Sequence, residues 1–320
     1  MADVLFSDLI EKVYRRVMGG IRERTVTVNG AILLTDLVVT LAGPQTVGIS
    51  PGTILALGME LIYVTLWSPS TLVATIQRGY LGSTPAAHAN GVLAYINPRY
   101  SRYDIGIAIN DDINSMSSPA NGLYRVGVAS VSYNAVFMGY DLGSISDNFN
   151  DILNVRYATP LPFKNFPAVK RWSIHRNIPD PAFPSGNGLI VYDGGWPGMN
   201  MYVTYTAPFL PLVLPTDSIL NTPVGNDVAP PFKGYGVATT VENVPPTATD
   251  IPALGAEIDL TLPREISRNF MESQPDARKA LEVVAGAVAG SVKALIARRD
   301  DRMSEEADRL TRQYARSRGW

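Results

Sequence analysis

The first twenty residues carry apolar side chains at the spacing of one helix face. These side chains, at i, i+3, i+4, i+7, i+8 and i+11, are Phe6, Leu9, Ile10, Val13, Tyr14 and Val17. Such a period is typical of an amphipathic helix that packs against a core. Asp3 or Ser7 is suited to cap this helix, and Gly19-Gly20 is suited to end it. We therefore predict an N-terminal helix within residues 1–20.

The period changes to two after residue 20, which is the spacing of β-strands. The segment TVTVNGAILL has an Asn29-Gly30 hairpin signal between alternating residues. The segment TILALGMELIYVTLWSPSTLVATIQRG predicts three short strands with turns at Gly58-Met59 and Ser68-Pro69-Ser70, and VLAYI predicts another strand after the loop RGYLGSTPAAHANG. Residues 102–116 predict a short helix that leads out. We therefore expect a small antiparallel β module within residues 21–120.

The part of the chain between residues 121 and 250 is rich in Gly, Pro, Tyr and β-branched residues. The segments LIVYD, MYVTYTAPF and GVATTV are strand-like, with Pro and Gly between them. This pattern predicts a central β domain that resembles a sandwich.

The remaining residues, 251–320, return to a helical pattern. The segment DIPALGAEIDLTLPREISRNFM predicts a helix in two pieces broken at Pro263. A long helix is predicted from Pro275 or Asp276 to about Arg316. Its apolar face consists of Leu281, Val284, Val288, Val292, Leu295 and Ile296, continued more weakly by Met303, Leu310 and Tyr314. Because this helix is longer than one small core can cover, we expect it to need a partner surface. The predicted fold class is α+β, mainly β.

The composition of the chain narrows the classes of protein to which it can belong. Hydrophobic residues make up 46% of the 320 residues and charged residues 18%, which is typical of a folded chain. The net charge of -2 argues against a general nucleic-acid coat or a membrane-surface protein. The absence of cysteine excludes disulfides, thiolate nucleophiles and cysteine-ligated metals. We expect no secretion signal and no membrane span.

The histidines His88 and His175 are the first candidates for chemistry. The sequence neighbours of His88 in RGYLGSTPAAHANG include no acid, and arginines flank His175 in RWSIHRN. A catalytic base or a zinc site would need carboxylates from elsewhere. We therefore interpret the loop as structural, with a histidine that bonds to backbone. The loop residues concerned are Arg78, Gly79, Gly82, His88 and Gly91.

The phosphate-binding, dinucleotide-binding, zinc-protease and nucleophile-elbow motifs are absent from the sequence. We therefore predict no catalytic residue, no cofactor and no metal. One alternative stays open, which is a carbohydrate-binding or carbohydrate-cleaving β protein. Its candidate carboxylates are Asp141, Asp147, Asp151, Asp180 and Asp193. Its candidate aromatic platform is Trp172, Trp196, Tyr192, Tyr202, Tyr205 and Phe209. Tyr202 and Tyr205 have opposite parity, so we expect them to face opposite sides of a sheet.

The C-terminal helix carries the strongest signals for a partner. Gly286 and Gly290 form a small-residue stripe that lets another backbone approach closely. Glu305 and Asp308 precede Arg309 and Arg312 at the i,i+4 spacing that supports a solvated helix. The final twelve residues, RLTRQYARSRGW, hold four arginines, two aromatics and no acid, so they suit either an acidic partner or a solvated helix end. The predicted docking residues are Gly286, Gly290, Arg298, Arg299, Arg302, Arg309, Arg312, Tyr314, Arg316, Arg318 and Trp320.

The loop RGYLGSTPAAHANG resembles a segment common in virion proteins of tailed bacteriophages, in which a strand ending in Arg-Gly precedes a Gly-Thr-x-Ala-Ala-His-x-x-Gly loop. Ser83-Thr84-Pro85 departs from that pattern, which more often has a threonine pair. The segments DLIEKVYRRVMGG, PALGAEIDLTLPREISRNF and ALIARRDDRMSEEADRLTRQYA are similar to helical parts of phage neck proteins, the head-to-tail connectors or adaptors. The resemblance does not extend to the central β domain.

This resemblance implies a structural virion protein without catalysis. Adaptors form a homo-oligomeric ring, commonly of about twelve subunits, beneath the portal protein. The ring extends the DNA channel without sequence-specific binding and offers a platform to the next neck or tail protein. The implied location is the virion neck, and the host cytoplasm during assembly. A tail, baseplate or decoration protein is the alternative within virion proteins.

Overall fold

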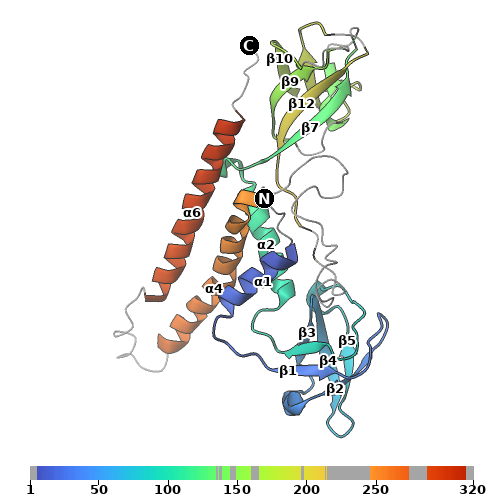
Figure 1. Cartoon of the computed structure of the whole chain (residues 1–320), viewed down its shortest axis with the longest axis vertical. Coiled ribbons are helices and arrows are strands. Elements are labelled where there is room, and N and C mark those ends of the chain that lie inside the picture. The colour runs from blue at the N-terminus through green and yellow to red at the C-terminus, as the bar shows by residue number, and fades with distance from the viewer. Residues whose placement is uncertain are drawn as a thin grey trace. The chain divides into compact units, whose positions relative to one another are not determined.

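The computed structural model describes most of the chain (Figure 1). The described residues are 6–134, 136, 139–144, 149–159, 166–195, 198–212, 214, 246–273 and 287–314. The chain divides into two compact units. Unit 1 comprises Met1–Ile113, Pro211–Phe232 and Pro246–Arg302. Unit 2 comprises Asn114–Leu210, Lys233–Pro245 and Met303–Trp320. The predicted fold class, α+β with a small antiparallel β module, a sandwich and a long C-terminal helix, is confirmed.

Unit 1 contains a closed antiparallel barrel with the strand order β1-β2-β5-β4-β3-β6. Its strands are β1 (Thr25–Val28), β2 (Val38–Ala42), β3 (Ile54–Leu57), β4 (Glu60–Ser68), β5 (Val73–Gln77) and β6 (Leu93–Ile96). Two short 3-10 helices, η1 (Pro44–Gly48) and η2 (Tyr80–Gly82), lie between them. Alternate residues of the strands fill the interior, as the period of two predicts. The predicted turns at Gly58-Met59 and after Ser68 are confirmed.

The predicted hairpin at Asn29-Gly30 is wrong. Strand β1 pairs with β2, which begins at Val38, ten residues after the end of β1 at Val28, and the intervening residues form a loop. The reason is a distant partner, since Ile32 pairs with His88 through two backbone hydrogen bonds of 2.9 Å. Gly30 still takes a left-handed φ of 104°, and its N–H donates to the Asn90 side chain at 2.8 Å.

The helices of unit 1 include both predicted short ones. Helix α1 (Phe6–Val17) buries Phe6, Leu9, Ile10 and Val13 and contacts α4. Helix α2 (Arg102–Met116) completely buries Ile105, Ile109 and Ile113, whereas Ile107 is exposed. The period-3.6 pattern therefore located α1 and its inner face, and the short helix predicted at 102–116 is confirmed as α2.

The predicted break at Pro263 is also wrong, because α4 (Asp250–Ser273) continues through that proline. A proline removes one intrahelical hydrogen bond, here the one to the Asp259 carbonyl. Packing of the helix's first half offsets that loss. The buried residues there include Ile251, Leu254 and Ile258, and Glu257 accepts a hydrogen bond of 2.7 Å from Arg16.

The predicted long C-terminal helix is present as α6 (Ala287–Gln313). Its buried residues include Val292 in unit 1 and Leu310 in unit 2. Leu281, Val284 and the other residues of 274–286 lie outside the described residues. Among the helices that the structure describes, none is both long and apolar enough to cross a membrane.

Unit 2 is built around a two-sheet sandwich. One sheet has the order β7-β12-β9, formed by β7 (Arg125–Ser132), β12 (Asn200–Ala207) and β9 (Asp151–Tyr157). The other has the order β10-β11-β8, formed by β10 (Trp172–Arg176), β11 (Asn187–Val191) and β8 (Gly139–Asp141). The 3-10 helices are η3 (Pro119–Asn121) and η4 (Leu142–Ser144) here, and η5 (Pro246–Ala248) in unit 1.

One core lies between the two sheets of the sandwich. Val155, Met201 and Val203 come from the first sheet, and Leu189 and Val191 from the second. The segments LIVYD and MYVTYTAPF form β11 and β12, as predicted, whereas GVATTV at 236–241 lies outside the described residues.

The packing of α2 against α4 generates a prediction. A Cβ added at Gly255 of α4 would overlap the carboxylate of Asp112, which is 95% buried and accepts a 2.6 Å hydrogen bond from Arg299. Although alanine favours helices, we expect Gly255→Ala to lower the free energy of unfolding by about 2 kcal/mol or more, because the Asp112 ion pair must shift. Urea denaturation measures this.

The matched control is Gly194→Ala, since a Cβ added at Gly194 meets no atom within 4 Å. We expect the control variant to unfold at the wild-type urea concentration. A Gly255→Ala variant as stable as the wild type would contradict the described packing.

Candidate functional site

The loop singled out in the sequence, RGYLGSTPAAHANG, is organised around a buried carboxylate. Glu60 is the first residue of β4 and Arg78 follows the last residue of β5. Arg78 donates through Nε to Oε1 of Glu60 at 2.6 Å and through Nη2 to Oε2 at 2.7 Å. The Glu60 side chain is completely buried and that of Arg78 is 5% exposed. This paired, bidentate geometry is the strong form of an arginine–carboxylate interaction.

His88 completes the same cluster. Its Nε2 lies 2.8 Å from Oε2 of Glu60, and its side chain is completely buried. The backbone N–H groups of Ala86 and Gly79 donate to the two carboxylate oxygens at 3.1 and 3.3 Å. Arg78 also donates to the Leu33 carbonyl at 2.7 Å. We call Glu60, Arg78 and His88 the barrel cluster.

The expectation that the His88 side chain bonds to backbone is corrected by this cluster. The acid that the sequence neighbours do not supply comes from Glu60, 28 residues earlier. A signal for it was present in the strand pattern. Glu60, Ile62 and Val64 share the inward side of β4, and an acid on the apolar side of a strand requires a buried partner.

The glycines of the loop allow backbone that other residues rarely adopt. Gly79 and Gly82 have left-handed φ values of 64° and 84°. A Cβ at Gly79 would also lie 2.9 Å from the Ser83 carbonyl oxygen. Ser83 in turn accepts a 2.9 Å hydrogen bond from the Leu61 N–H, which ties the loop to β4. Gly91 has a φ of 87° and leads the chain toward β6.

The electrostatics of the barrel cluster are those of a structural ion pair. Burial by itself raises the pKa of Glu60, but the hydrogen bonds from Arg78, His88 and the Ala86 N–H outweigh it and lower that pKa to about 2. The carboxylate is therefore ionised at neutral pH and enclosed by its donors. A catalytic carboxylate needs access to a substrate, and this one has no exposed surface. The cluster holds the loop in place.

The other candidates for chemistry are dispersed over unit 2. His175 on β10 contacts the Ser173 hydroxyl at 3.0 Å. The described carboxylates bind nearby groups. Asp141 accepts from the Ser185 hydroxyl, Asp151 from the Ile152 N–H, Asp180 from the Ala182 N–H, and Asp193 from the Lys170 and Arg171 N–H groups. Asp147 and Trp196 lie outside the described residues.

In the part of the chain that the structure describes, no three His or acidic side chains form a group that could hold a metal ion. The aromatic candidates are also separated. Tyr205 lies over Gly127 and is 6% exposed, whereas Tyr202 lies on the other face of the sheet beside Phe166. The opposite orientation of Tyr202 and Tyr205 was correctly predicted.

The arginines of α6 fall into two groups. Arg299 donates to Asp112 at 2.6 Å and Arg302 to Asp250 at 2.8 Å, so both hold unit 1 together. Arg309 bonds to Glu306 and Gln313 on its own helix. Arg298 and Arg312 are exposed and have no ion pair among the described residues.

The remaining predicted docking residues are placed as follows. Gly290 lies in α6, and Tyr314 follows its last residue and is half-buried. Gly286, Arg316, Arg318 and Trp320 lie outside the described residues.

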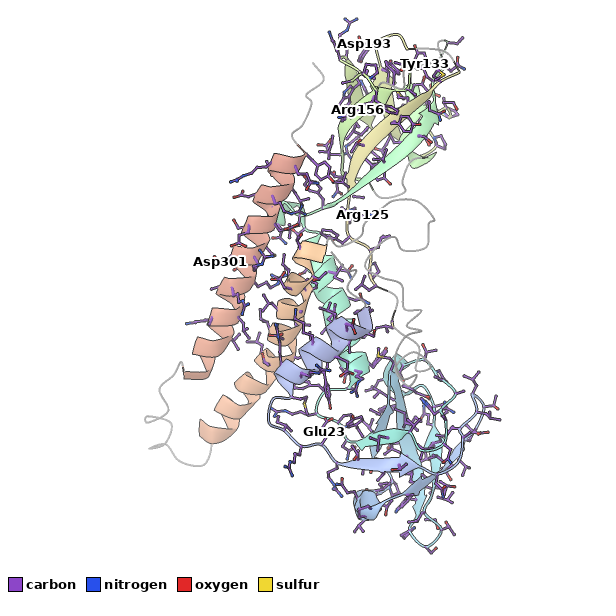
Figure 2. The ribbon with its side chains drawn as sticks, in the orientation of Figure 1. Glu23, Arg125, Tyr133, Arg156, Asp193 and Asp301 are labelled. Atoms are coloured by element: carbon purple, nitrogen blue, oxygen red, sulfur yellow. The ribbon has the colours of Figure 1, made fainter. Side chains whose placement is uncertain are left out.

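The exposed side of α6 alternates in charge along the helix. Basic residues Lys293 and Arg298 come first, then the acids Asp300, Asp301 and Asp308, and then Arg312. Asp301 lies on the exposed side of the helix (Figure 2). A partner that binds here must present both signs of charge, which the arginine count alone did not indicate.

The barrel cluster predicts a pH dependence. The folded-state pKa of Glu60, about 2, is below its ordinary value of 4.5, so ionised Glu60 stabilises the fold above about pH 4.5. This stabilisation is lost as the pH falls from 4.5 to about 2. We expect Glu60→Gln to lower the free energy of unfolding at pH 7 by about 3 kcal/mol, because Arg78 loses its buried counter-charge.

Urea denaturation between pH 2 and pH 7 tests this, with Asp301→Asn as the control for loss of an exposed acid. The control should keep the wild-type pH dependence. A Glu60→Gln variant with wild-type stability and an unchanged slope below pH 4.5 would show that the cluster does not stabilise the barrel.

Comparison with known proteins adds no relative. No protein-family model matches the chain, and no curated protein sequence matches it. The function must therefore be argued from the residues and their arrangement.

Proposed function

We propose that this protein is a structural component of a tailed-phage virion, a neck adaptor that forms a ring between the portal protein and the tail. The observation that carries the proposal is the loop RGYLGSTPAAHANG, whose resemblance to a segment of virion proteins extends to the residues that build the barrel cluster. Arg78 and His88 belong to that segment, and the side chains of both contact Glu60 within hydrogen-bond distance. The residues that this loop shares with the pattern it resembles therefore serve the fold of the barrel.

A role in assembly is supported by an apolar patch on the outside of the barrel. Its side chains are between 52% and 64% exposed, and they belong to Leu33, Leu34, Leu37, Val38 and Leu66. Val38 on β2 and Leu66 on β4 both pair with Thr75 on β5. The Leu37 carbonyl accepts from the Ile76 N–H at 2.9 Å, which places the loop beside the same strand. Exposed apolar patches of this kind mark protein–protein contacts.

A bulge in β4 is the reason that Leu66 belongs to this apolar patch. The pairing with β5 shifts between Val64 and Leu66, so the two side chains face opposite sides although they are two residues apart. Val64 is completely buried and Leu66 is 64% exposed, whereas Trp67 packs on the barrel core. The backbone of the strand thus places a large apolar side chain in solvent. In the proposed ring, a neighbouring subunit covers it.

The exposed side of α6 is the proposed surface for the portal protein. Of the predicted docking residues, Arg298 and Arg312 are exposed on this side of the helix. Arg299 and Arg302 instead form ion pairs with Asp112 and Asp250 inside unit 1. Truncation of the helix would remove these two internal ion pairs as well as the docking surface. Substitutions of exposed residues therefore separate docking from folding.

The ring is tested by negative-stain electron microscopy of the full-length protein, alone and bound to heads that lack the neck. We expect rings of about twelve subunits for the wild type. Leu66→Ser should shift the protein to smaller species, because it removes apolar surface from the subunit contact. Val136→Ser, at a residue that is 84% exposed in unit 2, is the matched control and should leave the ring intact. Wild-type protein that is monomeric under both conditions would contradict the proposal.

The docking surface is tested by binding to the portal protein of the same virus. Arg298→Glu should weaken binding about tenfold, since it reverses a charge in the proposed interface. The control is Arg22→Glu, which reverses an exposed charge elsewhere in unit 1. If the two variants bind the portal protein equally well, α6 is not part of the interface.

A further inference from the structure

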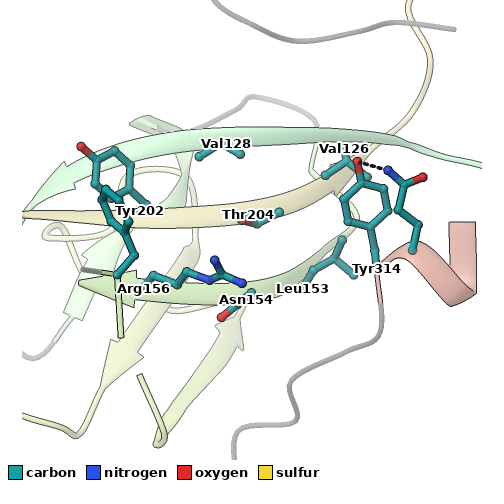
Figure 3. Close-up of a pocket in the computed structure, with 10 residues that line it drawn as sticks. Val126, Val128, Leu153, Asn154, Arg156, Tyr202, Thr204 and Tyr314 are labelled. Atoms are coloured by element: carbon teal, nitrogen blue, oxygen red, sulfur yellow. Dashed lines mark hydrogen bonds between the residues drawn. The ribbon is translucent and has the colours of Figure 1, made fainter. Parts of the chain in front are cut away.

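Unit 2 has a hollow on the outer face of the β7-β12-β9 sheet, opposite the sandwich core (Figure 3). Its volume of about 720 Å³ is in the range of small-ligand sites. Met201 and Val203 of β12 face the core, so the alternate residues Tyr202 and Thr204 face the hollow. The lining consists of Val126, Val128, Leu153, Asn154, Arg156, Phe166, Tyr202, Thr204, Gln313 and Tyr314.

A β-bulge shapes the floor of the hollow. Thr204 pairs with Asn154 and Tyr205 with Ile152, so the register of β9 and β12 passes over Leu153. The bulge turns Leu153 and Asn154 to the same side, and both line the hollow. The amide oxygen of Asn154 is buried and has no hydrogen-bond partner among the described residues. An unpaired buried acceptor is costly, and here the cost lies in the floor of the hollow.

Arg156 supplies a positive charge at the same place. It is exposed, lies opposite Tyr202 in the register of β9 and β12, and extends along the hollow (Figure 3). No ion pair joins it to a carboxylate within the described ranges, and the lining contains no Asp or Glu. A guanidinium in this setting favours a carboxylate on the ligand, which it can bind through two parallel hydrogen bonds.

Aromatic side chains complete the lining. Phe166 is 44% exposed and meets Tyr202 edge to face, with ring centroids 5.6 Å apart. Tyr314 and Gln313 lie at the other end, where their side chains hydrogen-bond at 3.4 Å. Aromatic faces with neighbouring hydroxyl and amide groups suit a ligand that has both an apolar ring face and polar substituents.

We propose that this hollow binds an acidic saccharide, with a uronic-acid unit whose carboxylate pairs with Arg156 and whose ring packs on Phe166 and Tyr202. The site binds without cleaving, because glycoside hydrolysis uses a pair of carboxylates and the lining residues that the structure describes include none. A single-stranded nucleic acid fits less well, since such strands are bound along grooves with several basic residues, whereas Arg156 is the one cation among the described residues of the lining. The inference is independent of the assembly role.

The test compares two tetrasaccharides that differ in charge, a hyaluronan tetrasaccharide and neutral chitotetraose, by isothermal titration calorimetry with the full-length protein. We expect the wild type to bind the acidic tetrasaccharide at least about tenfold more tightly. Arg156→Gln should abolish that preference, and Phe166→Ala should weaken binding of the acidic tetrasaccharide. Lys170→Gln removes an exposed charge of unit 2 outside the hollow and is the matched control, expected to keep the preference.

Both variants in the hollow replace exposed or partly exposed side chains, and circular dichroism melting verifies that each is folded. Three results would overturn the proposal. They are absence of binding to the acidic tetrasaccharide, a preference that survives in Arg156→Gln, and tighter binding of a thymidine oligonucleotide that Arg156→Gln abolishes.

Discussion

The buried carboxylate of Glu60 is the constraint on which the barrel depends. An ionised group without exposed surface is stable only where donors surround it, and here the donors come from Arg78, His88 and two backbone N–H groups of one loop. Because all of these donors must reach one carboxylate, the backbone of this loop can follow only one path. That path brings the His88 backbone to Ile32 and carries the chain to β6, which closes the barrel against β1.

Local patterns predicted most of the elements in this chain. The helical period located α1, and the period of two located β3, β4 and β5, because each depends on residues close in sequence. The two errors have a common cause. The tight hairpin predicted at Asn29-Gly30 does not form, because Ile32 pairs with His88. The break predicted at Pro263 does not occur in α4, whose first half is buried. Contacts between residues far apart in sequence decided both.

The candidate sites were predictable to a smaller extent. Arg78 and His88 were identified as loop residues, but their partner Glu60 enters from another strand. Helical spacing located Arg299 and Arg302 on α6, yet it contains no information about the acids that α2 and α4 present to them. The hollow on the sandwich depends on a bulge in β9, and β9 itself was not among the strands predicted from the sequence.

That bulge also gives the sandwich a place where its length can change. The register of β9 and β12 passes over Leu153, while the residues on either side keep regular pairing with β12. Loss of this residue would leave the register of both halves of β9 intact, so a single-codon deletion there need not refold the domain. The shape of the hollow can therefore change while both halves of the sheet keep their pairing.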